Sequence, residues 1–136
     1  MRAALALLLL AAACAAPAGP PAACPAGMGP ATVAEAYLGQ GVRGRGEVTE
    51  AEWSAFLAEI VTPAFPDGLT VLDARGQWRG QDGQVARERS KVLLLVMPGA
   101  DMPAVRARLA PVEAAWKARF NQESVLTVLR PGCAGF

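Results

Sequence analysis

A short stretch from Asp73 to Lys91 gathers charged, amide and aromatic side chains around an Asp-Gly pair: DARGQWRGQDGQVARERSK. Arginine holds carboxylates through two parallel hydrogen bonds, and carboxylates and amides hold polar groups, so the stretch predicts binding chemistry. Catalysis has less support, because no nucleophile–base pair is recognisable and the chain contains no histidine. With three cysteines and no histidine, we expect no metal site and no cofactor.

The Asp-Gly pair predicts a hairpin with a two-residue turn. Counting back from that turn puts Gln77 opposite Glu88, and makes Arg75 a diagonal neighbour of Glu88 on the same face. The register therefore predicts an ion pair between Arg75 and Glu88. On the other face it sets Arg87 opposite Trp78, where a cation–π contact can form.

The binding candidates are Tyr37, Arg75, Gln77 and Glu88. The last three are expected to form a polar wall at the rim of an apolar sheet face. Tyr37, the single tyrosine of the chain, would join them from the first strand if it points to the same face. Such an Arg–Glu–Tyr set suits a carboxylate or another small polar ligand. The alternative is a projecting hairpin whose charges only keep it soluble and protect a sheet edge.

The segment that follows, KVLLLVM at residues 91–97, is apolar on both of its alternating faces. Two helices can cover one face of a small sheet, but not both. The other face would leave an apolar patch in water, which usually marks an interface. We therefore expect a homodimer through the open sheet face, or a ligand pocket there.

Periodicity and turn signals predict the elements that position these residues. Thr49 and Glu52 form a capping box that starts a helix with an apolar stripe, and a Thr-Pro pair ends it at residues 62–63. Asp101 caps a second helix through about Phe120, which Pro111 should kink or divide. The expected strands are residues 31–39, about 69–78, 85–97 and 123–129, and residues 40–47 form a glycine-rich loop.

The order strand, helix, strand, strand, helix, strand is typical of an α+β fold. It predicts a ferredoxin-like split βαβ sandwich, a four-stranded antiparallel sheet with two helices on one face. In this arrangement the last strand lies antiparallel beside the first.

The first 13 residues predict a signal peptide, because one early arginine precedes a short apolar run that ends in small residues. Cys14 follows at once and is a candidate for lipidation, although the usual leucine three places earlier is replaced by Ala11. Simple cleavage at a nearby Ala-x-Ala site is the alternative. Residues 14–30 form an Ala/Pro/Gly-rich tether, and residues 31–136 form a single domain.

Cys24 and Cys133 remain once Cys14 is lipidated or removed. An exported chain sits where disulfides persist, so we expect these two to pair, against the alternative of two unrelated thiols. The predicted fold agrees, because it brings the start of the first strand near the end of the last one.

The mature chain has a net charge near zero, since removal of the leader removes Arg2 from 13 basic residues and leaves 12 acidic ones. Such a chain lacks the field that draws nucleic acid or anionic lipid. We expect no nucleic-acid partner, and a membrane association only through a lipid anchor at Cys14.

The middle run TPAFPDGLTVLDARGQW, with YLG before it and RERSKVLLLV and ARFNQESVL after it, resembles the uncharacterised bacterial family DUF3574. The resemblance covers about Tyr37 to Phe136. It implies a small, exported protein, often a lipoprotein, and it implies no activity. Two positions depart from the family pattern: Ala64 stands where a basic residue is usual, and Pro111 interrupts the helix. If that basic residue helps to bind a ligand, its absence weakens the role here.

The sequence therefore favours an exported protein of the periplasm, free or membrane-anchored, that acts as a small binding or interaction module. The alternative is a cofactor-independent enzyme of the dimeric ferredoxin-like type, with a pocket on the sheet face. That alternative rests on fold analogy alone.

Overall fold

The computed structural model describes residues 23–136. The predicted signal peptide, Cys14 and the tether up to residue 22 lie outside the described residues. In the described part, no helix is both long enough and apolar enough to cross a membrane.

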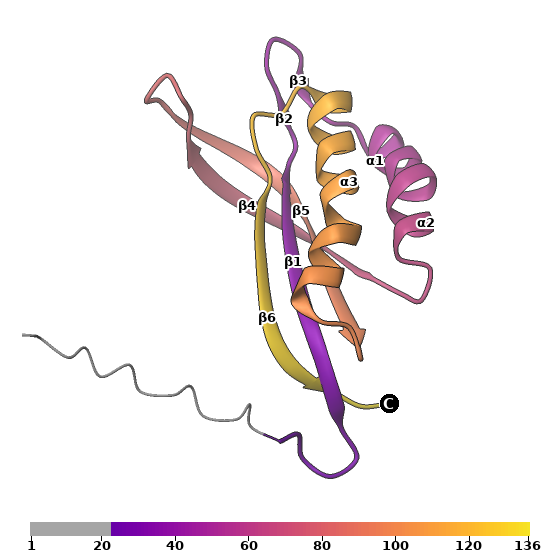
Figure 1. Cartoon of the computed structure of the whole chain (residues 1–136). Coiled ribbons are helices and arrows are strands. Elements are labelled where there is room, and N and C mark those ends of the chain that lie inside the picture. The colour runs from indigo at the N-terminus through magenta and orange to yellow at the C-terminus, as the bar shows by residue number, and fades with distance from the viewer. Residues whose placement is uncertain (1–22) are drawn as a thin grey trace, which may run out of the picture.

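A four-stranded antiparallel sheet forms the centre of the fold (Figure 1). The last strand pairs antiparallel with the first, as predicted, and the strand order across the sheet is β4-β5-β1-β6. A short ribbon of two strands forms within the expected glycine-rich loop. The strands are β1 (Gly29–Gly39), β2 (Gly41–Val42), β3 (Gly46–Glu47), β4 (Thr70–Arg79), β5 (Val85–Pro98) and β6 (Leu126–Ala134).

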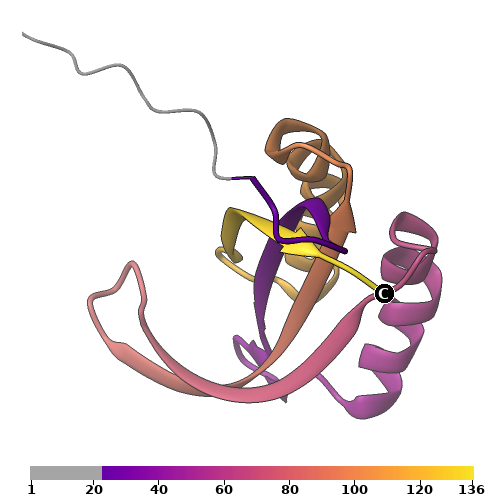
Figure 2. The same ribbon diagram turned by 90° about the horizontal axis from the view of Figure 1, so that it is seen from below.

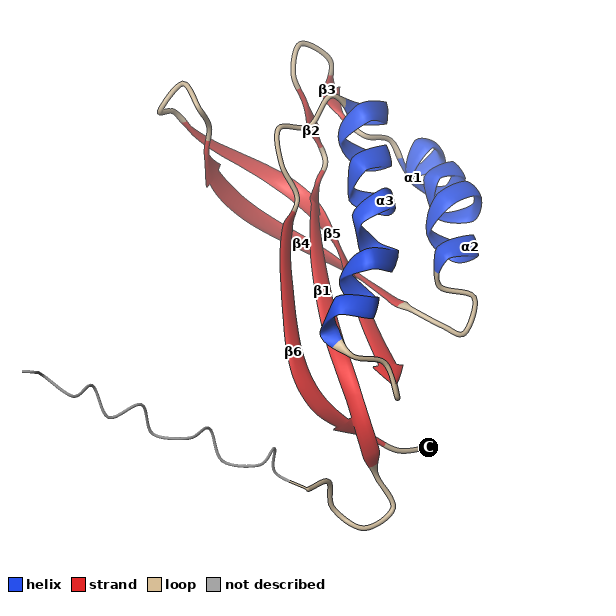
Figure 3. Cartoon of the chain, viewed as in Figure 1, coloured by secondary structure: helices blue, strands red, loops and turns tan. Residues whose placement is uncertain are grey.

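The helices lie on one face of this sheet, in two layers with it (Figures 2 and 3). The first helical stretch consists of α1 (Glu50–Phe56), a π-helical turn η1 (Leu57–Val61) and α2 (Thr62–Ala64), and the second is α3 (Met102–Phe120). Between helices and sheet lies an aromatic core, in which the Phe56 and Trp116 rings meet edge to face at 4.9 Å. The predicted capping box is confirmed: Thr49 accepts from the Glu52 backbone, and the Glu52 carboxylate accepts from the Thr49 backbone.

The predicted end of the first helix at residues 62–63 and the predicted division of the second at Pro111 are wrong. The first helical stretch continues past Thr62, because the π-helical turn, in which the Thr62 NH bonds to the Leu57 carbonyl, widens the helix just before Pro63. The long helix α3 runs unbroken through Pro111. Pro111 lies on the exposed side of α3, where water can satisfy the carbonyl that a proline leaves without a partner.

The hairpin between β4 and β5 has a three-residue loop, and the predicted two-residue turn is wrong. The Gly83 NH bonds to the Gly80 carbonyl, and Gly80 pairs with Gln84. Gly83 then takes a φ of +77°, the left-handed conformation that glycine adopts without strain. The predicted pairing is therefore shifted by one residue, so that Gly76, rather than Gln77, lies opposite Glu88.

A shift of one residue moves every side chain of β4 to the other face relative to β5. The face under the helices receives the odd-numbered residues of both strands, because Leu93 and Leu95 are fully buried there. The open face receives the even-numbered residues of β4 and β5 and, through the pairing of Tyr37 with Val92, the odd-numbered residues of β1.

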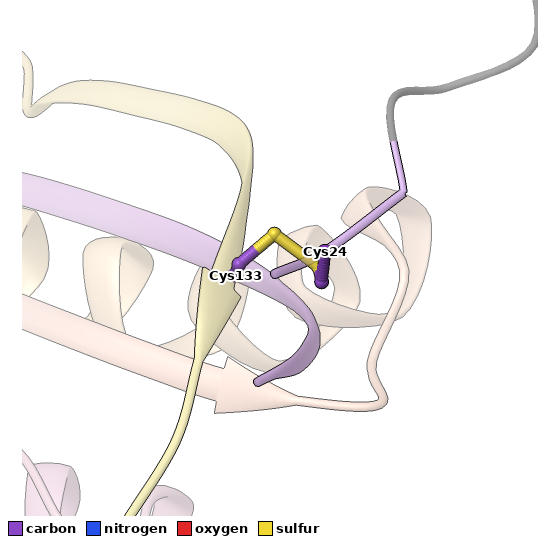
Figure 4. Close-up of a disulfide and its surroundings, with 2 residues drawn as sticks. All are labelled: Cys24 and Cys133. Atoms are coloured by element: carbon purple, nitrogen blue, oxygen red, sulfur yellow. A yellow bond between two sulfur atoms is a disulfide. The ribbon is translucent and has the colours of Figure 1, made fainter. Parts of the chain in front are cut away.

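Cys24 and Cys133 form the predicted disulfide, with Cα atoms 5.6 Å apart (Figure 4). Strand β6 extends beyond its predicted end and brings Cys133 to the start of β1, where it pairs with Pro30. The bond links two residues separated by 109 positions, and thus closes almost the whole described domain into one loop.

Replacing both cysteines, Cys24→Ser with Cys133→Ser, should lower the free energy of unfolding by about 5 kcal/mol, the loop-closure entropy that the simplest model gives for a loop of this length. Urea unfolding followed by circular dichroism measures the change. Each single variant should lose as much as the double variant, since either one opens the loop. An unchanged midpoint in the double variant would show that the bond does not stabilise the fold.

Candidate functional site

The open sheet face is apolar and exposed. Among the described residues no element covers it, since both helical stretches lie on the opposite face (Figure 2). Its large apolar side chains remain well exposed: Leu72 48%, Val96 46%, Leu126 55% and Val128 38%. This confirms the expectation that β5 is apolar on both faces, and an exposed patch of this kind marks an interaction site.

A polar set lies in the middle of this apolar face. The Tyr37 hydroxyl donates to the Glu35 carboxylate at 2.6 Å, and the Arg130 guanidinium donates to the other oxygen of the same carboxylate. The hydrogen bond from Tyr37, with that from Arg130, lowers the pKa of Glu35 below its usual value, and the same bond raises the pKa of Tyr37. The set therefore carries a carboxylate and a guanidinium that neutralise each other.

A cavity of about 640 Å³ lies at the end of the open face, where the β4–β5 hairpin projects beyond the sheet (Figure 1). Its volume is in the range of ordinary small-molecule sites. One wall is the hairpin, and the other comes from the β1–β2 connection and the segment before β6. Its lining includes Tyr37, Gly39, Gly41, Arg43, Gly76, Trp78, Glu88, Ser90, Gln122, Glu123 and Leu126.

Glu88 is fixed in this cavity by glycines. Its carboxylate accepts a hydrogen bond from the Gly41 NH at 2.7 Å. A Cβ atom at Gly39 would lie 2.5 Å from the carboxylate, and one at Gly41 would lie 2.7 Å from it, so a side chain at either position would displace the carboxylate. Opposite Glu88 on β4 stands Gly76, where a Cβ would meet nothing within 4 Å. The cavity is thus hollow beside Glu88, because the neighbouring strand has no side chain there.

The four predicted candidates all border this cavity, but the structure divides them. Tyr37 and Glu88 belong to the open face, while Arg75 and Gln77 leave from the other side of the hairpin. There they border a second hollow with Glu47 and Arg89, which Glu88 also lines. The predicted wall of Arg75, Gln77 and Glu88 on one face is therefore wrong.

Both predicted side-chain pairs of the hairpin are wrong for the same reason. Among the described residues, Arg75 forms no ion pair with Glu88, which bonds to the Gly41 backbone instead. Trp78 lies opposite Ala86, so Arg87 leaves from the other face and cannot cover its ring. The one-residue change in the turn accounts for both errors.

Comparison with known proteins identifies the family. A model described as "Protein of unknown function (DUF3574)" matches residues 34–136. The chain belongs to this family. No curated protein sequence matches it. Ala64, one of the two positions expected to depart from the family pattern, packs against the helix-face core and does not line the cavity.

Two solved structures of a phage SAM lyase are similar in fold to this DUF3574 protein. One, in complex with S-methyl-5'-thioadenosine, has a TM-score of 0.63 at 15% identity and covers 79% of this chain and 92% of its own. The other, in the apo state, has a TM-score of 0.55 at 15% identity and covers 81% of this chain and 91% of its own. At this identity the similarity concerns the fold.

A second charged cluster of the DUF3574 protein lies on the helix face and is internally satisfied. The Lys91 ammonium group, only 5% exposed, donates to Asp73 at 2.6 Å and to Glu50 at 2.9 Å, with the Trp53 ring 5.7 Å away. Burial by itself would lower the pKa of Lys91. The hydrogen bonds that Lys91 donates to Asp73 and Glu50 outweigh this effect, so its pKa lies above the ordinary value. This cluster joins β4 and β5 to the start of α1, so we assign it a structural role.

Sequence reasoning missed several polar residues that are far apart in the sequence and lie together in the structure. Glu35 alternates with apolar neighbours along β1, which was a usable signal, but Arg130 lies beyond the predicted end of β6. On α3, the nearly buried Glu113 accepts two bonds from Arg106 and one from Thr127 of β6. No pattern in the sequence predicts these bonds of Glu113. Neither among these residues nor elsewhere in residues 23–136 do three or more metal-ligating side chains gather.

Replacing Gly41 with alanine should destabilise the protein by about 1–3 kcal/mol, because the added methyl group displaces the Glu88 carboxylate. The cost should shrink in the Glu88→Ala background, where the carboxylate is absent. A double-mutant cycle on free energies of unfolding measures this coupling. Gly76→Ala is the matched control, since its methyl group enters open space. Additive effects of Gly41→Ala and Glu88→Ala would contradict the contact.

Proposed function

We propose that this protein is a small exported binding module, with its ligand site in the cavity beside Glu88. The observation that carries the proposal is an apolar, exposed sheet face that runs into a cavity lined by the Glu88 carboxylate, which the Gly41 NH holds in place. Ligand sites usually combine apolar walls with a few placed polar groups, as here. The amino-terminal sequence supports export to the periplasm, and Cys14 is the candidate for a lipid anchor.

We also propose the ferredoxin-like class for the fold. Two features support it: the alternation of strands and helical stretches along the chain, and the position of β6 antiparallel beside β1. In this class the sheet keeps one face free of helices, and that free face is where the binding surface lies.

A second copy of the chain is the partner proposed for the open face. The face is apolar over all four strands, so its burial in a homodimer would remove Leu72, Val96 and Leu126 from water. At the centre of the face the charges of Glu35 and Arg130 neutralise each other, so the same region of a second copy meets no unbalanced charge there. A partner seated there would also approach the cavity, since Tyr37 and Leu126 belong to both.

A cofactor-independent enzyme is the second candidate function. The observation that favours it is the likeness of the fold to a phage SAM lyase, combined with a cavity large enough for a small substrate. Fold likeness is an analogy and assigns no residue a catalytic role. The two candidates differ in turnover: consumption of SAM by the purified protein would favour the enzyme, and binding without turnover favours the module.

The dimer is testable by a charge placed on the open face. Val96→Glu should convert a dimer into a monomer. In the monomer the carboxylate is solvated at this half-exposed position, whereas burying it against an apolar partner would cost free energy. Light scattering coupled to size exclusion measures the mass. Ala118→Glu, on the exposed side of α3, is the matched control and should remain dimeric. A monomeric wild-type protein at high concentration would remove the dimer from the proposal.

A further inference from the structure

We propose that the cavity beside Glu88 takes a small organic cation, an ammonium-bearing molecule whose charged head lies over the Glu88 carboxylate. This inference rests on the proposed function, because it names the ligand class of the same cavity. Three observations carry it. The carboxylate has no cationic partner among the described residues, aromatic residues line the same cavity, and the other charged groups there are paired or leave from the opposite side of the hairpin.

The Glu88 carboxylate is positioned, half-buried and without a cation. One of its oxygens accepts from the Gly41 NH, and among the described residues no arginine or lysine forms an ion pair with it. A half-buried carboxylate is stabilised by a partner of opposite charge. A ligand cation would supply that partner, and the empty space above Gly76 gives it room beside the carboxylate.

Two aromatic residues border the same cavity. Trp78 is a diagonal neighbour of Glu88 across the hairpin, and half of its surface is exposed. Tyr37 lines the same cavity from farther along β1, where its hydroxyl donates to Glu35. Aromatic faces attract organic cations, tryptophan most strongly, and together with a carboxylate they form the usual environment for an ammonium head group.

The other charged groups around the cavity do not compete for this role. Arg43 is paired with Glu123, and the Asp82 carboxylate caps its own turn by accepting from the Gln84 backbone. Arg75 and Arg87 also border the cavity, but by the register of the hairpin their side chains leave from its opposite side. The carboxylate of Glu88 is therefore the charge available to a ligand on the open side, and its sign selects a cation over an anion.

The experiment is an NMR titration of the ¹⁵N-labelled protein with choline and with its neutral isostere 3,3-dimethyl-1-butanol, which has the same shape without the charge. Choline should shift the Trp78 indole NH and the amides of Gly76 and Glu88, and the neutral alcohol should bind roughly tenfold more weakly or not at all. Trp53 and Trp116 are buried in the core, so their indole signals should stay in place.

The variant that tests the charge is Glu88→Gln, which keeps an oxygen for the Gly41 NH and should leave the fold intact. It should lower choline affinity roughly tenfold, the value of one charge-assisted contact. Glu47→Gln, which removes a carboxylate from the second hollow, is the matched control and should bind choline as the wild type does. Trp78→Leu provides a second variant that should also weaken binding.

Equal binding of choline and the neutral alcohol, or unchanged choline binding in Glu88→Gln, would overturn the inference and leave the cavity as a ligand site of another class. Absence of choline binding would overturn it as well. In that case the same signals are followed with acetate and with glucose. A shift with either probe would support the cavity as a ligand site, and no shift with any probe would contradict the proposed function.

Discussion

The pairing register between β4 and β5 decides which side chains share the candidate site. Because the hairpin closes through a three-residue loop, Gly76 lies opposite Glu88 and Trp78 joins Glu88 on the open face. A two-residue turn would instead place Arg75 and Gln77 beside Glu88 and would fill the hollow with paired charges. A two-residue type I′ turn would need a positive φ at Asp82 as well as at Gly83, and only Gly83 has one, so the backbone at Asp82 separates the two outcomes.

The two faces of the sheet serve different purposes. On the helix face, the helices cover an aromatic core, and the buried charges Lys91 and Glu113 form ion pairs and hydrogen bonds with other side chains. The open face keeps exposed apolar residues and a cavity with a fixed carboxylate. A disulfide at one end of the β1–β6 pair holds the frame, while the cavity lies at the other end, beside the hairpin (Figure 1). Function is therefore expected on the open face, where apolar side chains are exposed and a carboxylate has no cationic partner among the described residues.

Much of the fold could be predicted because its signals are local. The capping box at Thr49, the apolar stripe after it and the order of the elements each depend on residues close in sequence. The Cys24–Cys133 bond could be predicted because few alternatives remain once the leader is set aside. The strand β6, in contrast, was expected to end where its apolar alternation ends, although backbone pairing carries it on to Ala134.

The site could be predicted only in part, because its geometry depends on register. An Asp-Gly pair suits a two-residue turn, but it suits equally a longer loop in which only the glycine has a positive φ. The sequence does not distinguish the two loops, and the loop length decides which side chains of β4 lie on which face of the sheet. Contacts between distant strands, such as Arg130 with Glu35, depend in turn on how far each strand extends. Tyr37 and Glu88 could be placed in one cavity from the sequence, but their neighbours could not.

The register itself is open to direct measurement by nuclear Overhauser effects between α-protons across the hairpin. Adjacent strands bring α-protons close at the pairs that do not exchange hydrogen bonds. Since Gly80 bonds to Gln84, these pairs should be Gln77 with Arg87 and Arg75 with Arg89. Strong effects at both pairs are the predicted result. An effect between Trp78 and Arg87 instead would establish the two-residue turn, return Arg75 to the face of Glu88, and contradict the account of the cavity.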